Sequence, residues 1–570
     1  MNDWKRNLRI SVVAPFFCAA LAACSAFAGP TPSIVRSEDG RARLHVGGEP
    51  FVILGGELLN SSGSTAEDML SKWDSLKRLN LNTVLVAVAW EQVERTEGNF
   101  DFSVLKSLIA QARERGVKLV PLWFGSWKNG SSGYAPHWVM RDTSRFPRMV
   151  NKNGENRPYL SSLSPEVLKA DKRAFSAMME FIKNEDPRGE TVIMVQIENE
   201  IGLLDDSRDR SPEAEKAFRE KVPEELLSRI GAGRDILPEI AEAWERNGRR
   251  RGGSWEEVFG QGNALADEMF MAWHYGRFVE ELARAGKKIH NIPMYVNAWT
   301  ISPGNPPPGS YPSGGPNHRM IDVWQAAAPS VDFLAVDNYQ REFVAKCRQF
   351  VRAGNPLFVP EACALWEGDG ESGPAKAFYT IGELGAIGFS PFAIDYPVYG
   401  PGHPLADAYG VLANLMPEIT KARAGDNMRG FMQQAHLRDT QKADSFDFGD
   451  IRANVHYNYD YPGYGLIIRL SKEEFLVAGS GIDVHFFSNL KEKRGIGYGL
   501  LREGRYEGGE WKTSRYLGGD EAHGGVGGLH MPPVYLKRDA RPGQISVIRA
   551  HVFTVGNSTY KNTGFLDGAQ

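Results

Sequence analysis

Short apolar runs alternate with amphipathic stretches along the first two thirds of the chain, from about Ser33 to Tyr399. The run Thr191–Val195 is β-branched and apolar, which is typical of a strand buried on both faces. Polar or aromatic residues follow directly after many of these runs. The eight runs are Phe51–Gly55, Thr83–Ala89, Lys118–Leu122, Val192–Ile197, Met294–Val296, Phe333–Val336, Leu357–Val359 and Ser390–Ile394.

The stretches between the runs place apolar residues at helical spacing. Eight strand–helix alternations predict an α/β fold, a (β/α)8 TIM barrel over residues 33–400, whose active site lies at the C-terminal ends of the strands. A doubly wound sheet is the alternative, but no glycine-rich phosphate loop follows the first run. The helical stretches include Glu67–Leu79, Ser103–Arg115, Leu168–Lys183, Ala264–Ala285 and Ala375–Gly385.

Two segments interrupt the alternation, and a third region ends it. Residues 203–263 are charged and predict a helical insertion, either a solvated excursion or a wall of the cleft. Ser302–Pro316 is rich in Pro, Gly and Ser and is either a lining of substrate subsites or a passive rigid loop. Beyond about Gly400 the runs become short and β-rich with glycine-dense turns. Residues 401–570 therefore predict an all-β domain, sandwich-like in architecture.

The N-terminus has the proportions of a secretory signal peptide, residues 1–28. Basic residues precede the apolar stretch Ile10–Ala23, which is too short to span a bilayer. Leu21–Cys24 resembles a bacterial lipobox, which would leave a lipidated Cys24, whereas Ala26–Ala28 is an ordinary A-x-A cleavage site. Both readings predict an exported protein, in the periplasm or anchored to the outer membrane as a lipoprotein.

The bulk composition excludes several classes of function. A formal charge of −4 provides no basic excess for binding a nucleic acid. Cys347 and Cys363 are the two cysteines outside the signal region, so no disulfide framework is implied. The 12 histidines show no paired ligand spacing, and we therefore expect no metal site. Eleven per cent aromatic residues is a high share, as sugar-binding clefts and large cores both use.

The segment QIENEIG places four polar side chains, Gln196 and Glu198–Glu200, at the end of the fourth run. Burying polar groups at a strand end is costly unless they are paired or the strand opens into a wet cleft. Retaining hydrolysis of a glycosidic bond needs two carboxyl groups about 5 Å apart, one protonated and one ionised. Glu200 and Glu361 follow two different runs of the predicted barrel, so they can supply such a pair.

Several motifs, in order along the chain, resemble family 35 β-galactosidases of the clan A glycoside hydrolases. Asn199–Glu200 after the fourth strand and FVPEA with Glu361 after the seventh are similar to the catalytic positions of that clan. The resemblance runs through nearly the whole barrel and extends to the bacterial branch with one compact β-domain, some of whose members remove galactose from xyloglucan. The other matching segments are Gly55–Ser62, Leu81–Glu94, Glu97–Phe102 and Phe124–Gly130.

The resemblance implies a role for each matching residue. Glu200 would be the general acid/base and Glu361 the nucleophile. Asn199 would bind the sugar 2-hydroxyl, and Tyr339 would orient Glu361 by a hydrogen bond. Two carboxylates and water suffice for this chemistry, so no cofactor is implied.

Further residues are weaker candidates for the substrate site. Glu57 occupies a position where many family members contact the sugar, and Trp127, Trp299 and Tyr396 are candidate stacking or subsite residues that could equally pack at the rim. Glu198 is a less favoured acid, since its side chain should alternate away from Asn199 into a polar layer of the barrel. Glu91 and Glu94 are either sugar ligands or salt-bridge partners, and His137 is expected to be structural.

The sequence also departs from the family pattern. Leu58–Asn60 stand where many members read I-H-Y, and Ser126 or Lys128 stands where many have a carboxylate. Galactose specificity is therefore less well determined than the mechanism. The prediction is an exported, retaining exo-β-galactosidase with a carbohydrate substrate. The alternatives are a clan A glycosidase for β-glucosides, β-mannosides or β-glucuronides, a non-catalytic carbohydrate-binding lipoprotein, and an adhesion protein led by the β-domain. The natural polymer and the oligomeric state stay open.

Overall fold

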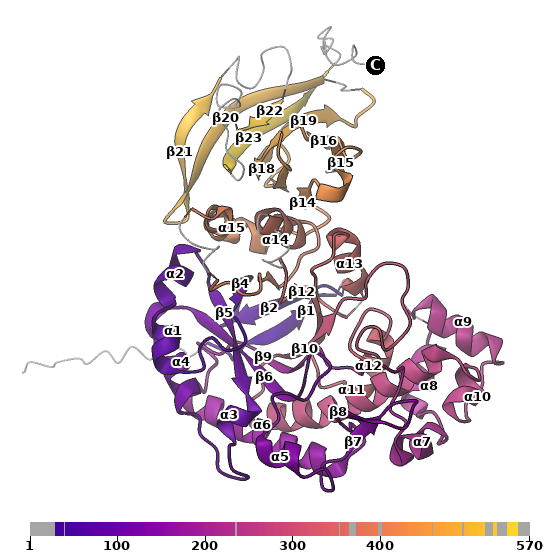
Figure 1. Ribbon diagram of the computed structural model, residues 1–570. Helices are drawn as coiled ribbons and strands as arrows, with labels where there is room; N and C mark the ends of the chain where they lie inside the picture. Colours follow the sequence, from indigo (N-terminus) through magenta and orange to yellow (C-terminus); the bar gives the residue numbers. More distant parts are fainter. Residues whose placement is uncertain are drawn as a thin grey trace, which may run out of the picture.

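The computed structural model describes residues 29–38, 40–233, 236–352, 354–363, 372–396, 402–458, 460–492, 495–518, 528–532 and 544–556. Figure 1 shows a barrel wrapped in helices and a second, strand-rich lobe, with helices α14 (Gly373–Gly382) and α15 (Pro404–Lys421) between them. The predicted signal peptide, including Cys24, lies outside the described residues. Within the described ranges, no helix has both the length and the apolar character needed to cross a bilayer.

Eight parallel strands form one sheet in the order β11-β10-β9-β6-β5-β4-β13-β12. The two ends of this sheet meet through a parallel bridge between Asn338 and Ala362, so the strands surround a ring in chain order. The (β/α)8 barrel prediction is confirmed. The strands are β4 (Ile53–Glu57), β5 (Thr83–Ala89), β6 (Lys118–Lys128), β9 (Val195–Asn199), β10 (Met294–Trp299), β11 (Phe333–Asp337), β12 (Phe358–Val359) and β13 (Gly388–Phe389).

The eighth strand lies before its predicted position, since Gly388–Phe389 pairs with β4 while residues 392–395 form a turn after it. Ile394 is buried against Gly56, where an added Cβ would lie 2.6 Å from its side chain. Because the turn is buried, its amino-acid composition is as apolar as that of a buried strand. Apolar composition alone does not separate a strand from a buried turn, and the predicted run Ser390–Ile394 is corrected accordingly.

Side chains from the barrel strands form an apolar cluster in the barrel interior. This cluster includes Leu85, Leu122, Tyr295 and Phe358. Helices cover the outside, and several have clear start signals; for example, Ser164 accepts a hydrogen bond from the Val167 N–H at the start of α6. These helices are α1 (Ala66–Leu70), α2 (Trp73–Arg78), α4 (Ser103–Arg115), α6 (Pro165–Glu185), α11 (Ala264–Ile289), α12 (Ile321–Ala327), α13 (Phe343–Phe350), α14 and α15.

The segment after β9 contains four short helices and contacts the loop after β10. Leu203 and Ser313 exchange both backbone hydrogen bonds, at 2.9 and 2.8 Å. The Asp205 N–H also donates to the Gly309 carbonyl, and at Gly309 an added Cβ would lie 2.6 Å from a backbone oxygen. The two interruptions of the barrel thus form one wall beside the ends of β9 and β10. The four helices are α7 (Pro212–Phe218), α8 (Glu224–Gly231), α9 (Pro238–Arg246) and α10 (Trp255–Phe259).

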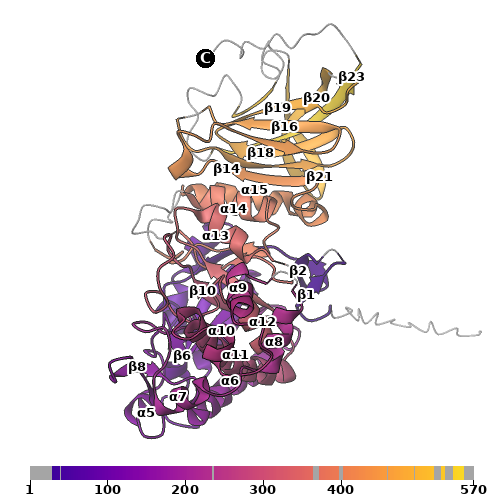
Figure 2. The ribbon, with the colours of Figure 1, turned by 90° about the vertical axis from the view of Figure 1, so that its right-hand side faces the viewer.

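The C-terminal lobe consists of two antiparallel sheets, one ordered β14-β17-β18-β23-β20-β21 and the other β15-β16-β19-β22. Apolar side chains from both sheets form one core. Figure 2 shows the strands of this lobe next to helices α14 and α15. The strands are β14 (Met428–Met432), β15 (Ala443–Asp447), β16 (Ile451–His456), β17 (Tyr464–Arg469), β18 (Glu474–Ser480), β19 (Ile482–Ser488), β20 (Gly495–Glu507), β21 (Glu510–Leu517), β22 (Leu529–Met531) and β23 (Ser546–Val555).

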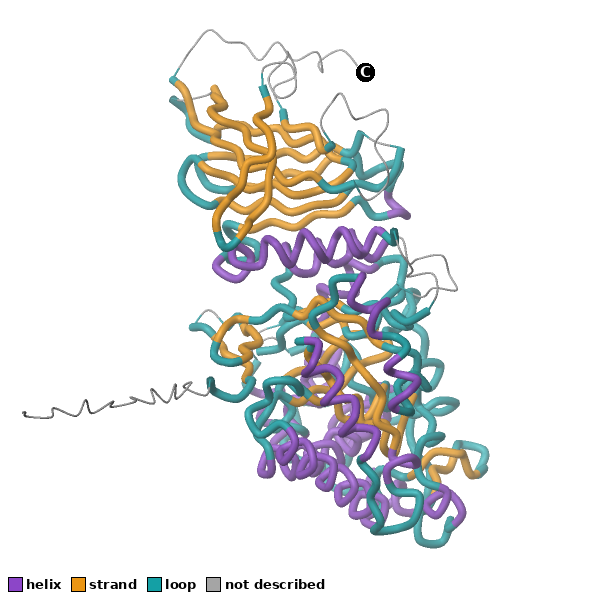
Figure 3. Tube along the Cα trace, turned by 90° about the vertical axis from the view of Figure 1, so that its left-hand side faces the viewer, coloured by secondary structure: helices purple, strands orange, loops and turns teal. Residues whose placement is uncertain are grey.

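The first part of the predicted all-β region is helical, because α15 occupies residues 404–421 and the first β-strand of the lobe begins at Met428. The α15 sequence buries Leu405, Leu412 and Ile419 on one side, which is a helical period rather than an alternation. The predicted C-terminal region therefore begins with a helix before its first strand. Figure 3 shows this helix lying along the β-lobe on the side that faces the barrel.

Smaller elements complete the chain. A three-stranded antiparallel sheet precedes the barrel, and a hairpin follows the third barrel strand. Cys347 and Cys363 are both buried and are not joined in a disulfide. The remaining elements are β1 (Ser33–Arg36), β2 (Ala42–Val46), β3 (Glu49–Pro50), β7 (Arg148–Val150), β8 (Asn156–Leu160), α3 (Trp90–Val93), α5 (His137–Arg141) and η4 (Ala435–Leu437).

Candidate active site

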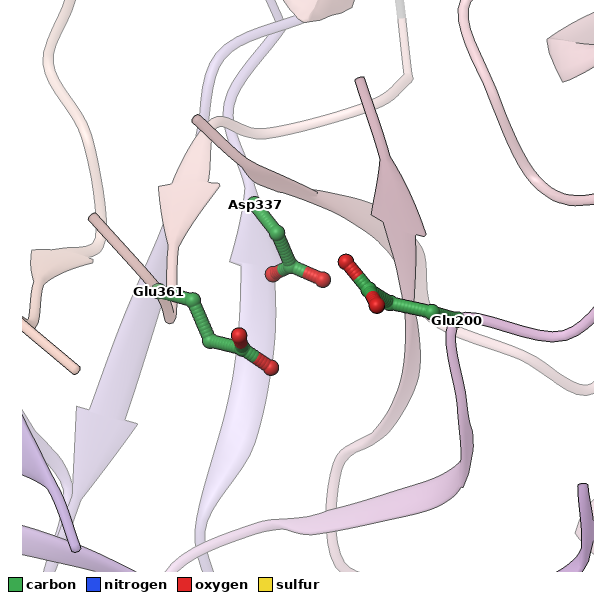
Figure 4. Close-up of side chains that lie close together, drawn as sticks. All are labelled: Glu200, Asp337 and Glu361. Atoms are coloured by element: carbon green, nitrogen blue, oxygen red, sulfur yellow. The ribbon is translucent and has the colours of Figure 1, made fainter. Parts of the chain in front are cut away.

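Four carboxyl groups meet at the C-terminal ends of the barrel strands. Glu57 ends β4, Glu200 follows β9, Asp337 ends β11 and Glu361 follows β12. Figure 4 shows the carboxyl groups of Glu200, Asp337 and Glu361 pointing toward a common centre, and one oxygen from each lies within 4.8 Å of the others. The barrel thus joins the two predicted glutamates, which are far apart in the sequence.

Three donors converge on the Glu361 carboxylate. The Tyr339 hydroxyl donates to its Oε2 at 2.8 Å, and Asn199 Nδ2 donates to its Oε1 at 3.1 Å. Asn297 Nδ2 lies 3.2 Å from the same Oε1. Because an ionised carboxylate only accepts hydrogen bonds, these donors hold Glu361 in one orientation and match its charged form.

Glu200 has the opposite environment. Burial and the nearby charge of Glu361 raise the pKa of Glu200 to about 8, and the positive charge of Lys128 limits this rise. Its backbone N–H donates to Asn297 Oδ1 at 3.0 Å, and its φ of +46° lies in the left-handed region that non-glycine residues rarely adopt. Glu200 therefore carries a proton at neutral pH and is held at a strained backbone position.

Asp337 is the third acid of the cluster. Burial raises its pKa well above the usual range, and the charges of Glu361 and Glu200 add to this effect. Asn297 Nδ2 donates to its Oδ2 at 2.7 Å, whereas its Oδ1 is buried without a hydrogen-bond partner among the described residues. A protonated Asp337 can donate to Glu200, and this hydrogen bond lowers the pKa of Glu200.

Glu57 is also buried among these groups. Neither of its carboxyl oxygens has a hydrogen-bond partner among the described residues. Burial raises the pKa of Glu57 well above the usual range, with the charge of Glu361 as the next cause. A neutral carboxyl group with free hydrogen-bonding capacity is suited to binding a hydroxyl group of a ligand.

Lys128, at the end of β6, is the buried cation of the cluster. Its pKa is lowered by burial and raised by Glu361, Glu200 and Glu57, and the net effect is a rise above the usual value. Glu200, Asp337 and Glu361 are the described residues close enough together to share one metal ion. A buried ammonium group already supplies positive charge to this same cluster.

Glu198 points into the scaffold rather than into the cluster. Its carboxyl group accepts the backbone N–H of Trp127 at 2.7 Å and that of Ser126 at 3.2 Å, and it also contacts Asp171. Its φ is +57°, so β9 leaves regular strand geometry here and simple alternation does not set its direction. Glu198 supports the end of β6.

The predicted aromatic residues divide into one buried and two exposed side chains. Trp127 is fully buried, and its indole packs edge-on against Tyr275 and Phe278 with centroids 5.3 and 4.7 Å away. The prediction of a stacking role for Trp127 is therefore wrong, since a sugar cannot reach this ring. Trp299 and Tyr396 are 40% and 52% exposed. Trp299 ends β10 and Tyr396 follows β13, at the same end of the barrel as the carboxyl groups.

The remaining candidates do not belong to the cluster. Glu94 is buried and accepts hydrogen bonds from the Trp90 indole and from Arg173, so it is a structural ion-pair partner. Glu91 and His137 are exposed on short helices, α3 and α5, which follow β5 and β6.

Reasoning from the sequence did not assign roles to Lys128, Asn297 and Asp337. Asn297 and Asp337 directly follow predicted runs, and this position is the available signal for them. Lys128 lies beyond the predicted run Lys118–Leu122, because β6 continues to Lys128. Nothing in their local sequence separates them from the other polar residues at strand ends. Their convergence depends on the closure of the barrel.

The Glyco_hydro_42 family model, described as beta-galactosidase, matches residues 63–358, and a domain of unknown function, DUF5597, matches residues 405–527. The first match covers most of the barrel and ends just before Glu361. The matching family differs from family 35, which the motifs resemble, so that finer assignment is not confirmed.

Among curated proteins, the chain is similar to Beta-galactosidase-1-like protein 3 of Homo sapiens, with 28% identity over 209 residues, and to that of Rattus norvegicus, with 27% identity over 198 residues. These matches cover 35% and 33% of this chain and 29% and 28% of the relatives. The chain therefore matches less than a third of the length of these curated relatives.

Among solved structures, the chain is similar to β-galactosidases from Bacillus circulans sp. alkalophilus and the psychrophilic Marinomonas ef1, with TM-scores of 0.46 and 0.45 and identities of 15% and 13%. The alignments cover 66% and 65% of this chain and 58% and 62% of the others. The exo-beta-1,4-mannosidase Op5Man5 from Opitutaceae bacterium strain TAV5 has a TM-score of 0.39 at 14% identity, covering 63% of this chain and 54% of its own.

Proposed function

Because this chain belongs to the Glyco_hydro_42 β-galactosidase family and is a glycoside hydrolase, we propose that it is a retaining exo-β-galactosidase. It releases terminal β-linked galactose from oligosaccharides or polysaccharides, with xyloglucan side chains as one candidate source. Glu200 is the general acid/base and Glu361 is the nucleophile.

The observation that carries this proposal is the separation of the two carboxyl groups. An oxygen of Glu200 lies within 4.8 Å of an oxygen of Glu361. Retaining glycosidases place their two carboxyl groups about 5–5.5 Å apart, whereas inverting enzymes need about 6.5–9.5 Å to admit a water molecule. The spacing leaves no room for that water, so it supports a covalent intermediate.

In the first step, an oxygen of the Glu361 carboxylate attacks the anomeric carbon and forms a glycosyl ester. The bond from that carbon to the glycosidic oxygen breaks, and the leaving oxygen takes the proton of Glu200. A pKa of about 8 keeps this proton in place at neutral pH. The products are the free aglycone and the glycosyl-enzyme.

In the second step, the ionised Glu200 removes a proton from a water molecule, and the resulting oxygen attacks the anomeric carbon. Glu361 leaves as a carboxylate, so the product keeps the β configuration. Ester formation neutralises Glu361, whose charge raises the pKa of Glu200 in the free enzyme. The pKa of Glu200 therefore falls when it has to act as a base.

Other residues of the cluster would bind the sugar. Asn199, beside Glu200 and hydrogen-bonded to Glu361, would contact the 2-hydroxyl, and Tyr339 holds the nucleophile in place. Glu57 has free capacity for a second hydroxyl group. Trp299 and Tyr396 are exposed and would contact the aglycone at the rim.

The nucleophile is tested by replacing Glu361 with Gly. We expect turnover of 2,4-dinitrophenyl β-galactoside to be lost, and added azide to restore it as the α-galactosyl azide. The matched variant Glu200→Gly should give the β-galactosyl azide, since its nucleophile is intact. A folded Glu361→Gly variant that is not rescued by azide would remove Glu361 from this role. The first-formed anomer, followed by NMR, must be β.

The sugar is tested separately with a panel of nitrophenyl glycosides. The presence of Ser126 or Lys128 where many family 35 members have a carboxylate is the observation behind the second candidate, a retaining glycosidase with another sugar specificity. A kcat/KM highest for the β-galactoside supports the first proposal. A higher value for the β-glucoside, β-mannoside or β-glucuronide would replace it and keep the mechanism.

We also propose that the protein is exported, on the basis of the N-terminal sequence. Metabolic labelling with a palmitate analogue, compared between the natural chain and Cys24→Ala, tests lipid attachment. Loss of label in the variant is expected for the lipobox reading. An unlabelled natural chain in the periplasmic fraction would indicate ordinary cleavage.

A further inference from the structure

Lys128 has no part in the two chemical steps, yet it is buried among the residues that perform them. It ends β6 with 6% of its surface exposed. Its ammonium group donates to Asn199 Oδ1 at 2.6 Å and lies 4.7 Å from the centre of the Phe124 ring. A lysine side chain is rarely buried without a specific partner, and here that partner is Asn199.

The Asn199 amide has chemically different ends, and its two partners distinguish them. The ammonium group of Lys128 can only donate a hydrogen bond, so it must face the amide oxygen. The carboxylate of Glu361 can only accept, so it must face the amide nitrogen, which lies 3.1 Å from it. A flipped amide would place its NH2 group against the ammonium group of Lys128 and its oxygen against the carboxylate of Glu361. A donor would then face a donor, and an acceptor would face an acceptor. The orientation of Asn199 therefore follows from its partners.

The backbone near Lys128 also aligns the two strands. Lys128 pairs in register with Asn199, and the next two residues donate backbone hydrogen bonds to the carbonyl groups of Asn199 and Glu200, both at 3.1 Å. The end of β6 thus fixes the backbone of the acid/base segment as well as the amide of Asn199.

Charges from several barrel strands favour the ammonium form. The charge of Glu361, after β12, is the largest effect that opposes burial and raises the pKa of Lys128, and Glu200, Glu57 and Asp337 act in the same direction when they are ionised. Its hydrogen bond to Asn199 is therefore made by a charged donor, which is roughly twice as strong as a neutral one.

We propose that Lys128 is a positioning residue that holds the Asn199 amide in the one orientation that serves both Glu361 and the sugar 2-hydroxyl. This inference rests on the proposed function, because it assigns the 2-hydroxyl to Asn199. Recognition of the 2-hydroxyl then depends on a residue that does not touch the sugar.

The test measures how much the 2-hydroxyl contributes to turnover. We compare kcat/KM for 2,4-dinitrophenyl β-galactoside and its 2-deoxy analogue in the natural enzyme, Lys128→Met and Lys128→Gln. With Lys128→Met, kcat/KM for the galactoside should fall by about ten- to a hundredfold, and that for the 2-deoxy substrate by less than about threefold. The ratio of kcat/KM between the galactoside and its 2-deoxy analogue should fall, because only the galactoside has the 2-hydroxyl whose contact with Asn199 is lost.

Lys128→Gln separates the hydrogen bond from the charge. The glutamine amide can still donate to Asn199 Oδ1, so the ratio should stay close to that of the natural enzyme. Lys169→Met, at an exposed lysine of α6, is the matched control and should change neither value. If Lys128→Met fails to fold, Lys128→Gln and Asn199→Ala decide the matter: the first should preserve the ratio and the second should collapse it.

Equal losses on both substrates in Lys128→Met would overturn the inference and assign Lys128 to charge balance alone. A Lys128→Gln ratio as narrow as that of Asn199→Ala would also overturn it. A crystal structure of Lys128→Met gives a readout independent of activity, in which the Asn199 amide should rotate away from Glu361. An unchanged amide contradicts the proposal. If the natural enzyme does not hydrolyse the galactoside, the proposed function fails first, and this inference fails with it.

Discussion

The side chains of Glu200, Asp337 and Glu57 lose contact with water in the folded protein, and burial is the main reason that the pKa of each rises. Their mutual repulsion adds to this effect. Lys128 opposes it for Glu200 and Glu57. The protonation of each acid in this cleft is therefore a property of the cluster.

The first prediction concerns the pH dependence of turnover. Glu200 must be protonated to act as the acid, and its pKa is about 8, so activity should fall as the pH rises through about 8. We expect kcat/KM for an alkyl β-galactoside, whose leaving group needs the proton, to drop about tenfold per pH unit above that value. A descending limb near pH 5 would contradict this assignment. A dinitrophenyl galactoside, which needs little acid assistance, is the control substrate.

The second prediction concerns stability. A carboxyl group whose pKa is raised on folding binds more protons in the folded state, so it lowers the free energy of unfolding as the pH rises from about 4.5 to about 8. Glu200→Gln removes this penalty and should stabilise the protein by a few kcal/mol at pH 8, with little gain at pH 4.5. Thermal unfolding at the two pH values measures it, with exposed Glu91→Gln as the control. If Glu200→Gln and the natural protein were equally stable at pH 8, the prediction would be refuted.

Among the secondary-structure elements, β6 and β9 lie side by side at the acid/base segment of the site. β9 ends in the acid/base segment, and β6 contributes Lys128 beside it. Glu198, on β9, accepts the backbone N–H groups of Ser126 and Trp127 and contacts the buried Asp171. These contacts fix the position of Lys128 through its own strand.

The third prediction tests this junction. Glu198→Ala leaves the buried Trp127 N–H without its acceptor, whereas the Ser126 N–H still donates to Asp171 Oδ2 at 3.0 Å. We expect the variant to be destabilised by about 1–3 kcal/mol. Glu198→Gln keeps an oxygen for the Trp127 N–H and an NH2 group that can donate to Asp171, so its loss should be much smaller. Urea unfolding of the two variants provides the measurement. Similar losses in both would show that the hydrogen bonds at this junction contribute little.

The two lobes of the molecule meet through a close approach of helix and sheet. Gly382 at the end of α14 lies against Gly430 of β14, where an added Cβ would lie 2.6 Å from the Glu383 nitrogen. Arg429 and Glu383 form a two-pronged ion pair beside this contact, at 2.9 and 2.7 Å. Asn414 of α15 also exchanges hydrogen bonds with the Tyr506 backbone. The β-lobe therefore packs firmly on the barrel.

The fourth prediction follows from this contact. Gly430→Ala should destabilise the protein by about 1–3 kcal/mol, because the new methyl group would overlap backbone atoms that cannot move independently. Gly252→Ala is the control, since its Cβ would meet nothing within 4 Å. Differential scanning calorimetry compares the two. A Gly430→Ala variant as stable as the control would show that the interface has room to adjust.

Prediction from the sequence succeeded where the signal is local. Seven of the eight apolar runs overlap a barrel strand, because burial on both faces leaves a direct mark on composition. It failed where two kinds of structure have the same sequence signal. Ile394 is as apolar as a strand residue but lies in a turn, and Trp127 sits in a matching motif but packs in the core.

The sequence by itself determined the order of the elements, the barrel and the strand ends that carry Glu200 and Glu361, since periodicity and polar run ends are properties of neighbouring residues. The tertiary structure alone decided that Lys128 holds Asn199, that Asp337 joins Glu200, and that Glu200 keeps its proton at neutral pH. These properties depend on distance and burial between residues far apart in the chain. The short distances and the burial arise only when the barrel closes.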